Sequence, residues 1–291
     1  MNISEALDNA RKTIIKKKKK LIWRDIFEIL SEVTKLEINK IHLYSDEFLL
    51  SIDEVKKFNE MIKSYCNNVP LSYIIKRRSF FGINFYVDER VLIPRFETEI
   101  LVSNVLEFIN LFKNKYPNDR IKLFDICTGS GVIGLSIKKN ISDIDLYLSD
   151  ISVDALEVAK INSNLLSIYG LFIYQGNFID PFLKNNLRAN IITINPPYIS
   201  HADKNLSNDV FLNEPRVSLF AEDDGLFFYK NLLQNYTRIV DIDKYFYIII
   251  EFGFQQKKEI EKLCSQYIKN NSYKFIKDYS NNWRFLILTN F

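Results

Sequence analysis

Hydrophobic side chains in residues 1–70 recur at the spacing of α-helices. One stripe, with intervals i, i+4, i+7, i+8 and i+11, consists of Ile22, Ile26, Ile29, Leu30 and Val33. These intervals place apolar side chains on one face of an amphipathic helix. A second helix is predicted after Ser51, because Glu54 follows it at capping-box spacing. The first glycine of the chain is Gly82. The pattern therefore predicts a small helical domain over residues 1–70.

The pattern changes over residues 71–95, where aromatic and β-branched residues alternate around Gly82. Alternation of this kind around a glycine is typical of a β-hairpin. We therefore predict a β-hairpin linker over residues 71–95, which joins the helical domain to a second domain over residues 96–291.

Strand-like and helix-like runs alternate in the second domain. The predicted strands are 121–126, 144–150, 171–175, 190–195, 245–252, 273–278 and 283–289. The predicted helices are 131–140, 152–170, 225–240 and 255–271. Ser152 is the expected N-cap and Gly170 the expected C-cap of the second of these helices. Repeated strand–helix units predict a mainly parallel, doubly wound α/β sheet. The last two strands are too close for a helical crossover, so the last strand is predicted to be antiparallel.

Composition and charge are those of an ordinary globular protein. Hydrophobic residues make up 47% and charged residues 26% of the chain, which is the usual balance of a soluble domain. The net charge of +3 and pI of about 8.5 are too mildly basic to indicate a stable nucleic-acid partner. The apolar run 245–250 is too short to cross a membrane. With Glu5 and Asp8 near the start, no secretory signal is predicted.

The cysteines and histidines exclude two further classes of protein. Cys66, Cys127 and Cys264 lie far apart without a Cys-x-x-Cys pair, and the chain has 2 histidines. Neither a structural zinc site nor a disulfide framework fits this set, so no metal is expected. Free thiols are typical of a reducing cytoplasm.

A basic run stands out from this even charge distribution. Residues 9–24 contain 8 basic residues, among them Lys16 to Lys20, and no acid. The run is typical of a solvated helix end in a lysine-rich chain; the alternative is a basic face for an acidic or RNA-associated partner.

A glycine-rich segment, DICTGSGVIG at 125–134, lies between the first predicted strand of the sheet and its helix. Glycines let the backbone approach a ligand and present N–H groups at the start of a helix. Asp150 ends the next strand, 21 residues after Gly129, where a carboxylate can bind ribose hydroxyls. This pattern indicates a nucleotide cofactor without distinguishing nicotinamide from adenosylmethionine. Asn177 and Phe178 follow the third strand, where they form an ordinary turn or contact an adenine.

The segment IITINPPYIS at 191–200 ends a buried strand with Asn195, Pro196, Pro197 and Tyr198. Proline fixes its own φ and keeps the preceding residue out of the helical region. The carbonyls of Asn195 and Pro196 are therefore held in narrow directions. Such an arrangement suits a site that grips a group with two N–H hydrogens.

These residues resemble a known family. Asn-Pro-Pro-Tyr after the fourth strand is similar to adenosylmethionine-dependent methyltransferases that act on amide or amino nitrogens. The segments 70–99, 213–233 and 248–256 resemble the HemK/PrmC group, which methylates glutamine in peptide chain release factors. The resemblance covers nearly the whole chain. It implies a Rossmann-like class I methyltransferase sheet, mostly parallel with the last strand antiparallel, behind a helical N-terminal domain and a hairpin linker.

The resemblance also implies an activity and its residues. S-adenosyl-L-methionine is the expected methyl donor, and the glutamine of the Gly-Gly-Gln motif of release factors is the expected acceptor, in a cytoplasmic and monomeric enzyme. The expected catalytic residues are Asn195, Pro196, Pro197 and Tyr198. The expected cofactor-binding residues are Cys127, Thr128, Gly129, Ser130, Gly131, Asp150, Asn177, Phe178 and Asn195. The helices of residues 1–70 are expected to dock the protein substrate, so their deletion should reduce activity on a folded release factor more than on a free peptide.

The chain departs from the family's pattern at four positions. Cys127 replaces the usual first loop glycine, Asn177 an acid, Phe178 another aromatic and Phe96 a proline. None of these changes removes a group that methyl transfer requires.

Four alternatives stay open at this point. The first is a ribosomal-protein glutamine methyltransferase, although the stretch from Arg95 to Glu99 looks more like the release-factor enzyme. The second is a nucleic-acid amino-methyltransferase acting on adenine or guanine. The third is a nicotinamide oxidoreductase, which fits the glycine loop alone. The fourth is a non-catalytic binding protein, against which Asn195 and Asp150 speak.

Overall fold

A computed structural model describes residues 1–203, 208–269 and 271–291. The chain divides into two compact units. Met1–Arg77 and helix α10 (Asn208–Asn213) belong to the first unit, and the remaining described residues from Arg78 onward form the second.

The first unit is helical, as predicted. Its further helices are α1 (Ile3–Lys16), α2 (Trp23–Thr34), α3 (Ile38–Leu43), α4 (Ile52–Cys66) and α5 (Leu71–Ile74). The predicted stripe is buried from Ile26 onward, whereas Ile22 precedes α2 and is 41% exposed. Ser51 and Glu54 form the predicted capping box of α4. The Tyr65 hydroxyl donates to Asp25 on α2 at 2.9 Å, so α4 and α2 are joined by a polar contact as well as by their apolar faces.

The predicted hairpin is present and belongs to the second unit, but it is shorter than the predicted range 71–95, because residues 71–74 form α5 of the first unit. Strands β1 (Arg78–Phe80) and β2 (Ile83–Phe85) pair antiparallel. Phe81 and Gly82 connect them with φ of 50° and 72°, and two consecutive positive φ angles are the requirement of a tight type I′ turn. Gly82 meets this requirement without strain.

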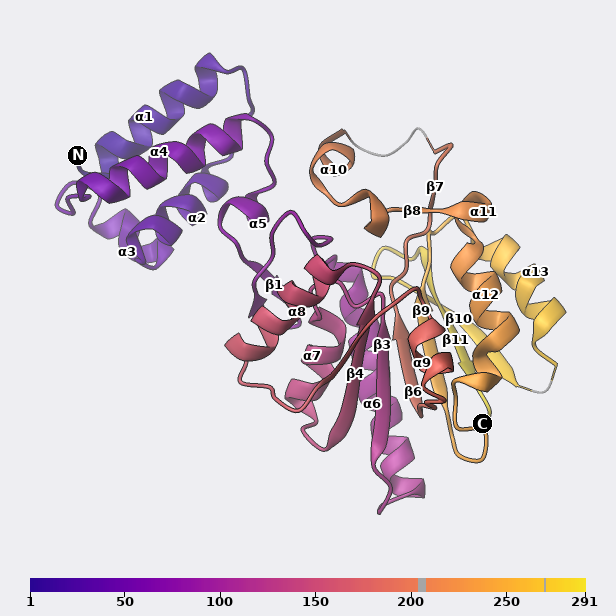
Figure 1. The fold of residues 1–291 in the computed structure, drawn as a ribbon. Helices are drawn as coiled ribbons and strands as arrows, with labels where there is room; N and C mark the ends of the chain where they lie inside the picture. Colours follow the sequence, from indigo (N-terminus) through magenta and orange to yellow (C-terminus); the bar gives the residue numbers. More distant parts are fainter. Residues whose placement is uncertain (204–207, 270) are drawn as a thin grey trace. The chain divides into compact units, whose positions relative to one another are not determined.

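The main sheet has seven strands in the order β10-β11-β9-β6-β3-β4-β5 (Figure 1). Their bounds are β3 (Ile121–Ile126), β4 (Ile144–Asp150), β5 (Phe172–Gln175), β6 (Ile191–Ile194), β9 (Tyr247–Glu251), β10 (Ser272–Lys277) and β11 (Trp283–Thr289). β11 pairs antiparallel with both β9 and β10, and the other pairs are parallel. This confirms the predicted class I methyltransferase sheet. The strand order reverses between β3 and β6, which is where ligands bind in such folds.

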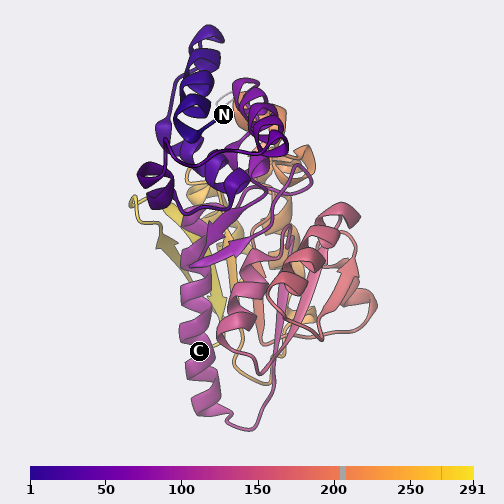
Figure 2. The same cartoon turned by 90° about the vertical axis from the view of Figure 1, so that its left-hand side faces the viewer.

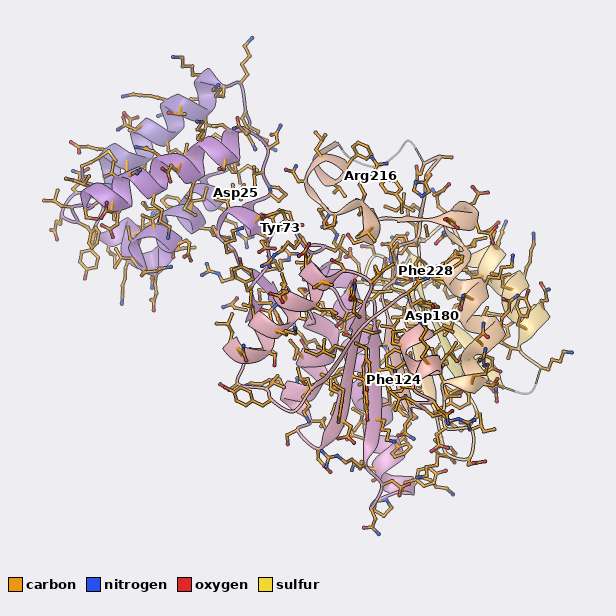
Figure 3. The ribbon with its side chains drawn as sticks, viewed as in Figure 1. Asp25, Tyr73, Phe124, Asp180, Arg216 and Phe228 are labelled. Carbon is orange, nitrogen blue, oxygen red and sulfur yellow. The ribbon has the colours of Figure 1, made fainter. Side chains whose placement is uncertain are left out.

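Helices cover both faces of this sheet (Figures 1 and 2). One face carries α6 (Glu99–Lys115), α7 (Val132–Asn140) and α8 (Val153–Leu165). The other carries α9 (Asp180–Lys184), α12 (Phe227–Asn235) and α13 (Lys257–Tyr267). Phe124 of β3 stacks on Phe182 of α9 with ring centroids 4.0 Å apart. Figure 3 shows Phe124 within the sheet and Phe228 near the carboxyl ends of its strands.

Two predicted helix ends differ from the structure. α8 ends at Leu165 instead of reaching Gly170. Ser167 takes the left-handed conformation (φ 55°), and the Ile168 N–H donates to the Ser163 carbonyl at 2.9 Å. This is the hydrogen bond of a Schellman motif, which stops the helix before the glycine. The helix predicted over 225–240 is α12 followed by a 3₁₀ turn (Tyr236–Arg238).

Shorter elements lie beside the carboxyl edge of the sheet. They are a 3₁₀ turn η1 (Phe96–Thr98), strands β7 (Ile199–Ser200) and β8 (Phe220–Ala221), a 3₁₀ turn η2 (Arg216–Ser218) and helix α11 (Glu222–Gly225). In the part of the chain that the structure describes, no helix combines the length and the apolar character that a membrane crossing requires.

Candidate active site

The glycine loop between β3 and α7 has three residues in left-handed conformations. The φ angles are 57° at Cys127, 53° at Gly129 and 81° at Gly131. The Thr128 N–H donates to the Ser149 carbonyl of β4 at 3.0 Å, which ties the loop to the sheet. A Cβ at Gly131 would lie 2.9 Å from Leu135 Cδ1, whereas one at Gly129 would meet no atom within 4 Å. Gly131 therefore packs against α7, and Gly129 borders open space.

The glycine loop is held by a buried acid that the sequence analysis did not single out. Asp125 accepts hydrogen bonds from the Thr128 hydroxyl at 2.5 Å, the Thr193 hydroxyl at 2.8 Å and the Gly134 N–H at 3.1 Å. Burial raises the pKa of Asp125 to about 6, against the effect of these hydrogen bonds. The only signal in the sequence was an acid inside the apolar run 121–126.

Gly134→Ala is expected to destabilise the protein by roughly 1–3 kcal/mol, the usual cost of overpacking a core. The new Cβ would lie 2.8 Å from Leu148 Cδ2 and 3.1 Å from the Asp125 Cβ, so the helix or the strand must shift. Urea unfolding measures the effect. Ser136→Ala, on the same helix, is the control, because it removes a buried hydroxyl that has no hydrogen-bond partner among the residues that the structure describes and should be neutral or slightly stabilising. Equal stability of Gly134→Ala and wild type contradicts the prediction.

Asp150 stands at the end of β4 beside the loop. Its Oδ2 accepts from the Gly129 N–H at 2.9 Å and its Oδ1 from the Ser152 N–H at 3.0 Å. Burial raises the pKa of Asp150, and backbone hydrogen bonds from Ser152, Gly129 and Ile151 oppose that rise. Because a carboxylate offers about four acceptor positions, these backbone groups leave room for a ligand's hydroxyl group.

Asn195 follows β6, one strand away from the loop. Its Nδ2 donates to the Thr98 hydroxyl at 3.3 Å. Among the described residues, no donor reaches the Asn195 side-chain oxygen or the Pro196 carbonyl. Neither oxygen on which the sequence hypothesis depends is therefore used by a donor among the described residues, although Pro196 is a buried residue.

A cavity of about 410 Å³ joins these groups at the carboxyl edge of the sheet. Most of the predicted site residues line it: Cys127, Thr128, Gly129, Ser130, Asp150, Asn177, Phe178, Asn195 and Pro197. Three others lie outside its lining, namely Gly131, Pro196 and Tyr198. Tyr198 directs its carbonyl to the Gln256 side chain, which donates at 2.9 Å. Phe178 is only 4% exposed and packs edge-on against Phe228.

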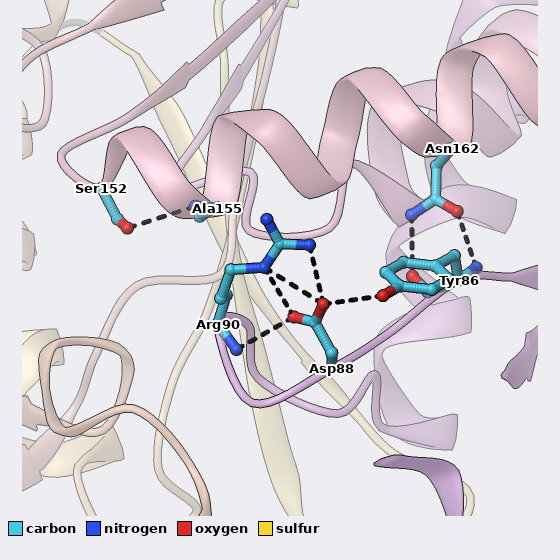
Figure 4. Close-up of polar contacts among 6 residues, drawn as sticks. All are labelled: Tyr86, Asp88, Arg90, Ser152, Ala155 and Asn162. Atoms are coloured by element: carbon cyan, nitrogen blue, oxygen red, sulfur yellow. Dashed lines mark hydrogen bonds and ion pairs between the residues drawn. The ribbon is translucent and has the colours of Figure 1, made fainter. Parts of the chain in front are cut away.

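The cavity lining also contains a group that the sequence analysis missed. Arg90 lines the cavity, and Asp88 holds its guanidinium at 2.7 Å (Figure 4). Asn162 of α8 bonds both backbone groups of Tyr86, at 2.7 and 2.9 Å, and so fixes this segment to the sheet domain. Scattered residues of these kinds carry no spacing signal, so sequence periodicity could not indicate them.

Arg95 is a second cation of the lining. It forms an ion pair of 2.8 Å with Glu214, whose side chain is 2% exposed. Glu214 also accepts from the Ile93 N–H at 3.2 Å. This bridge joins two segments far apart in the sequence at the mouth of the same cavity.

These donors and acceptors fit an adenosyl cofactor. Asp150 has free acceptors for ribose hydroxyls, Gly129 borders open space, and Asn177 and Phe178 lie on the wall beyond β5. In the described ranges, no group of three or more His, Cys, Asp or Glu side chains is placed to hold a metal ion.

Comparisons with known proteins agree with this geometry. Residues 103–245 match the family model of the methyltransferase small domain. The release factor glutamine methyltransferase of Mycoplasma mycoides is 37% identical over 92% of each chain. The release factor glutamine methyltransferase of Clostridium acetobutylicum is 33% identical over 90% of each chain. That of Leptospira interrogans is 35% identical over 87% of each chain. The chain belongs to the release factor glutamine methyltransferase (HemK/PrmC) family, as its Asn-Pro-Pro-Tyr and linker segments predicted.

Proposed function

We propose that this protein transfers a methyl group from S-adenosyl-L-methionine to the side-chain nitrogen of the glutamine in the Gly-Gly-Gln motif of release factors. The observation that carries the proposal is the Asn195 side-chain oxygen, which no donor among the described residues uses, in the lining of a cavity that also contains Asp150 and the glycine loop. Family membership supports the substrate class. We further propose that the enzyme acts in the cytoplasm as a monomer.

The cofactor-binding part of the site is assigned to the loop side of the cavity. Asp150 would accept hydrogen bonds from the ribose hydroxyls, and the backbone of residues 127–131 would lie along the cofactor. Asn177 and Phe178 would flank the adenine. When bound, the cofactor supplies a methyl group on a positively charged sulfur.

The substrate part of the site is assigned to Asn195 and Pro196. An amide nitrogen is a poor nucleophile, because its lone pair is delocalised into the carbonyl. The Asn195 side-chain oxygen and the Pro196 carbonyl would each accept one of its two hydrogens and hold the lone pair toward the methyl group. Pro197 restrains the Pro196 carbonyl, and Tyr198 is assigned to support the planar amide. Such alignment can lower a barrier by roughly 7–11 kcal/mol. The proton leaves after the nitrogen has become cationic, so no strong base is required.

Mass spectrometry of a purified release factor after incubation with the enzyme and cofactor tests this function directly. A gain of one methyl group on the glutamine of the Gly-Gly-Gln peptide is the expected result. Methyl transfer to ribosomal protein or to RNA in a parallel reaction, with the release factor unmodified, would refute the proposal.

The helical unit is proposed to dock the release factor. Several of its large apolar side chains are exposed, including Leu43 at 75%, Leu49 at 71% and Ile52 at 88%. Replacing these three by serine is expected to raise the KM for the folded release factor at least about tenfold, as loss of an interface anchor does. The rate on a free Gly-Gly-Gln peptide should stay unchanged, because the cavity residues belong to the other unit. An equal KM for the release factor in variant and wild type contradicts the docking role.

A further inference from the structure

Asn195 is the end of a chain of three hydrogen-bonded side chains. Its Nδ2 donates to the Thr98 hydroxyl at 3.3 Å, and that hydroxyl donates to Glu251 Oε2 at 2.7 Å. Thr98 is 2% exposed and Glu251 is 2% exposed. The three residues come from the end of β6, from η1 and from the end of β9. β6 and β9 are paired strands with Ile194 opposite Ile250, so the sheet register brings Asn195 and Glu251 to the same level.

The chemistry of this chain determines which way the Asn195 amide faces. An ionised carboxylate only accepts hydrogen bonds, and a hydroxyl has a single hydrogen. The Thr98 hydrogen therefore points to Glu251, and only lone pairs of the Thr98 oxygen face Asn195. A carbonyl oxygen opposite those lone pairs would be repelled, whereas an NH₂ group is bonded. The Asn195 amide is thus held with its nitrogen on Thr98 and its oxygen directed elsewhere.

We propose that Thr98 and Glu251 are positioning residues, which hold the Asn195 amide so that its oxygen faces the amide hydrogen of the substrate glutamine. The inference rests on the proposed function of Asn195 and adds what holds its side chain in the orientation that this function requires. Without the hydrogen bonds from Asn195 to Thr98 and from Thr98 to Glu251, the Asn195 amide can flip. Its NH₂ group then faces the NH₂ group of the substrate glutamine, and neither can accept a hydrogen bond from the other. Methyl transfer requires the other orientation, in which the Asn195 oxygen faces the substrate.

The protonation of Glu251 controls the same orientation. Burial raises the pKa of Glu251 to about 7, although the hydrogen bond from the Thr98 hydroxyl acts in the opposite direction. Arg284 and Arg95 favour its ionised form and Glu97 opposes it, while Tyr198 and Tyr229 are the other titratable groups coupled to it. A protonated Glu251 can donate to Thr98, which frees the Thr98 hydrogen to face the Asn195 oxygen. The kcat of the wild type is therefore expected to fall as the pH drops below about 7.

Substitution of Thr98 tests this chain of hydrogen bonds. Thr98→Val keeps the shape but removes the hydroxyl, and kcat should fall by about 10- to 100-fold, the range for a lost hydrogen bond in a charged network. The Kd for the cofactor and the KM for the release factor should stay within about twofold. Thr98→Ser, which restores the hydroxyl, should recover most of kcat. Thr289→Val is the matched control: among the described residues its hydroxyl bonds the Phe291 carbonyl alone, at 3.1 Å, and kcat should be that of the wild type.

A double-mutant comparison separates positioning from general support of the fold. If Thr98 acts through Asn195, then adding Thr98→Val to Asn195→Ala should produce no further loss of kcat. A further loss equal to that in the wild-type background means that Thr98 acts independently and overturns the proposal. So does a wild-type kcat in folded Thr98→Val. Either result would leave methylation of the release factor by the wild type unchanged. The experiment therefore distinguishes failure of this positioning role from failure of the proposed function.

Glu251→Gln provides a second route that does not depend on the folding of Thr98→Val. Glutamine does not titrate, so the fall of kcat below pH 7 should be absent, although kcat itself should be reduced because the amide can also donate to Thr98. The contribution of Glu251 to the stability of the wild type has the opposite pH dependence to kcat. Between pH 4.5 and about 7 the native state retains a proton on Glu251 that the unfolded state has lost, so this group makes wild-type stability decrease as pH rises through the window. Asp125, with a pKa of about 6, contributes to the same decrease, so the decrease should be smaller in Glu251→Gln than in the wild type. An unchanged acid limb of kcat in Glu251→Gln overturns the proposal.

Discussion

Asn195→Ala lowers the rate of glutamine methylation by about 10²–10³, the expected effect of deleting one preorganised hydrogen-bonding group. The variant loses the oxygen that accepts an amide hydrogen of the substrate, while the glycine loop and Asp150 are untouched. Affinity for the cofactor and the melting temperature should remain close to those of the wild type. Single-turnover kinetics with a saturating release factor measures the rate, and isothermal titration measures cofactor binding.

The control for this variant is Asn164→Ala. Asn164 is an exposed residue of α8, so the same change of residue type there should leave the rate unchanged. Full turnover by Asn195→Ala would refute the assigned role. A loss of cofactor affinity that accounts for the whole rate effect would instead place Asn195 in the cofactor half of the site.

Asp150→Ala weakens binding of S-adenosyl-L-methionine by about 10²-fold or more, because hydrogen bonds to a charged group are worth about 1.5–3 kcal/mol each and two would be lost. The substitution also removes the acceptor of the Gly129 N–H, so the loop loses one of its restraints. At saturating cofactor, the rate should recover to near that of the wild type, since Asp150 does not touch the substrate amide.

Asp154→Ala is the matched control for the cofactor site. Asp154 lies in the first turn of α8, two residues after the Ser152 cap, and is exposed. It should bind cofactor as tightly as the wild type does. If Asp150→Ala also binds normally, or if both variants are weakened equally through the net charge, Asp150 is not the ribose-binding acid.

Local signals in the sequence were sufficient for most of the elements. Alternation and apolar runs marked the hairpin and all seven strands of the main sheet, because strands buried on both faces read as continuous β-branched runs. The antiparallel last strand followed from the short separation of the final two runs. The end of α8 was wrong, because a glycine is the usual left-handed residue at a helix end, whereas Ser167 takes that conformation with φ of 55°. Tertiary packing of Ile168, which is 7% exposed, accompanies the earlier stop.

Residue types and spacing alone were sufficient to predict the fold class, a nucleotide loop with Asp150, and an amide-binding motif after β6. These are properties of contiguous segments, in which backbone restriction and strand periodicity act between near neighbours. The tertiary structure alone brought Arg90 and Arg95 into the lining of one cavity, bonded Asp125 to the glycine loop, and joined Thr98 to both Asn195 and Glu251. Those contacts join residues up to 153 positions apart, and the pairing of parallel strands contributes to them, because it brings the carboxyl ends of β6 and β9 to one edge of the sheet.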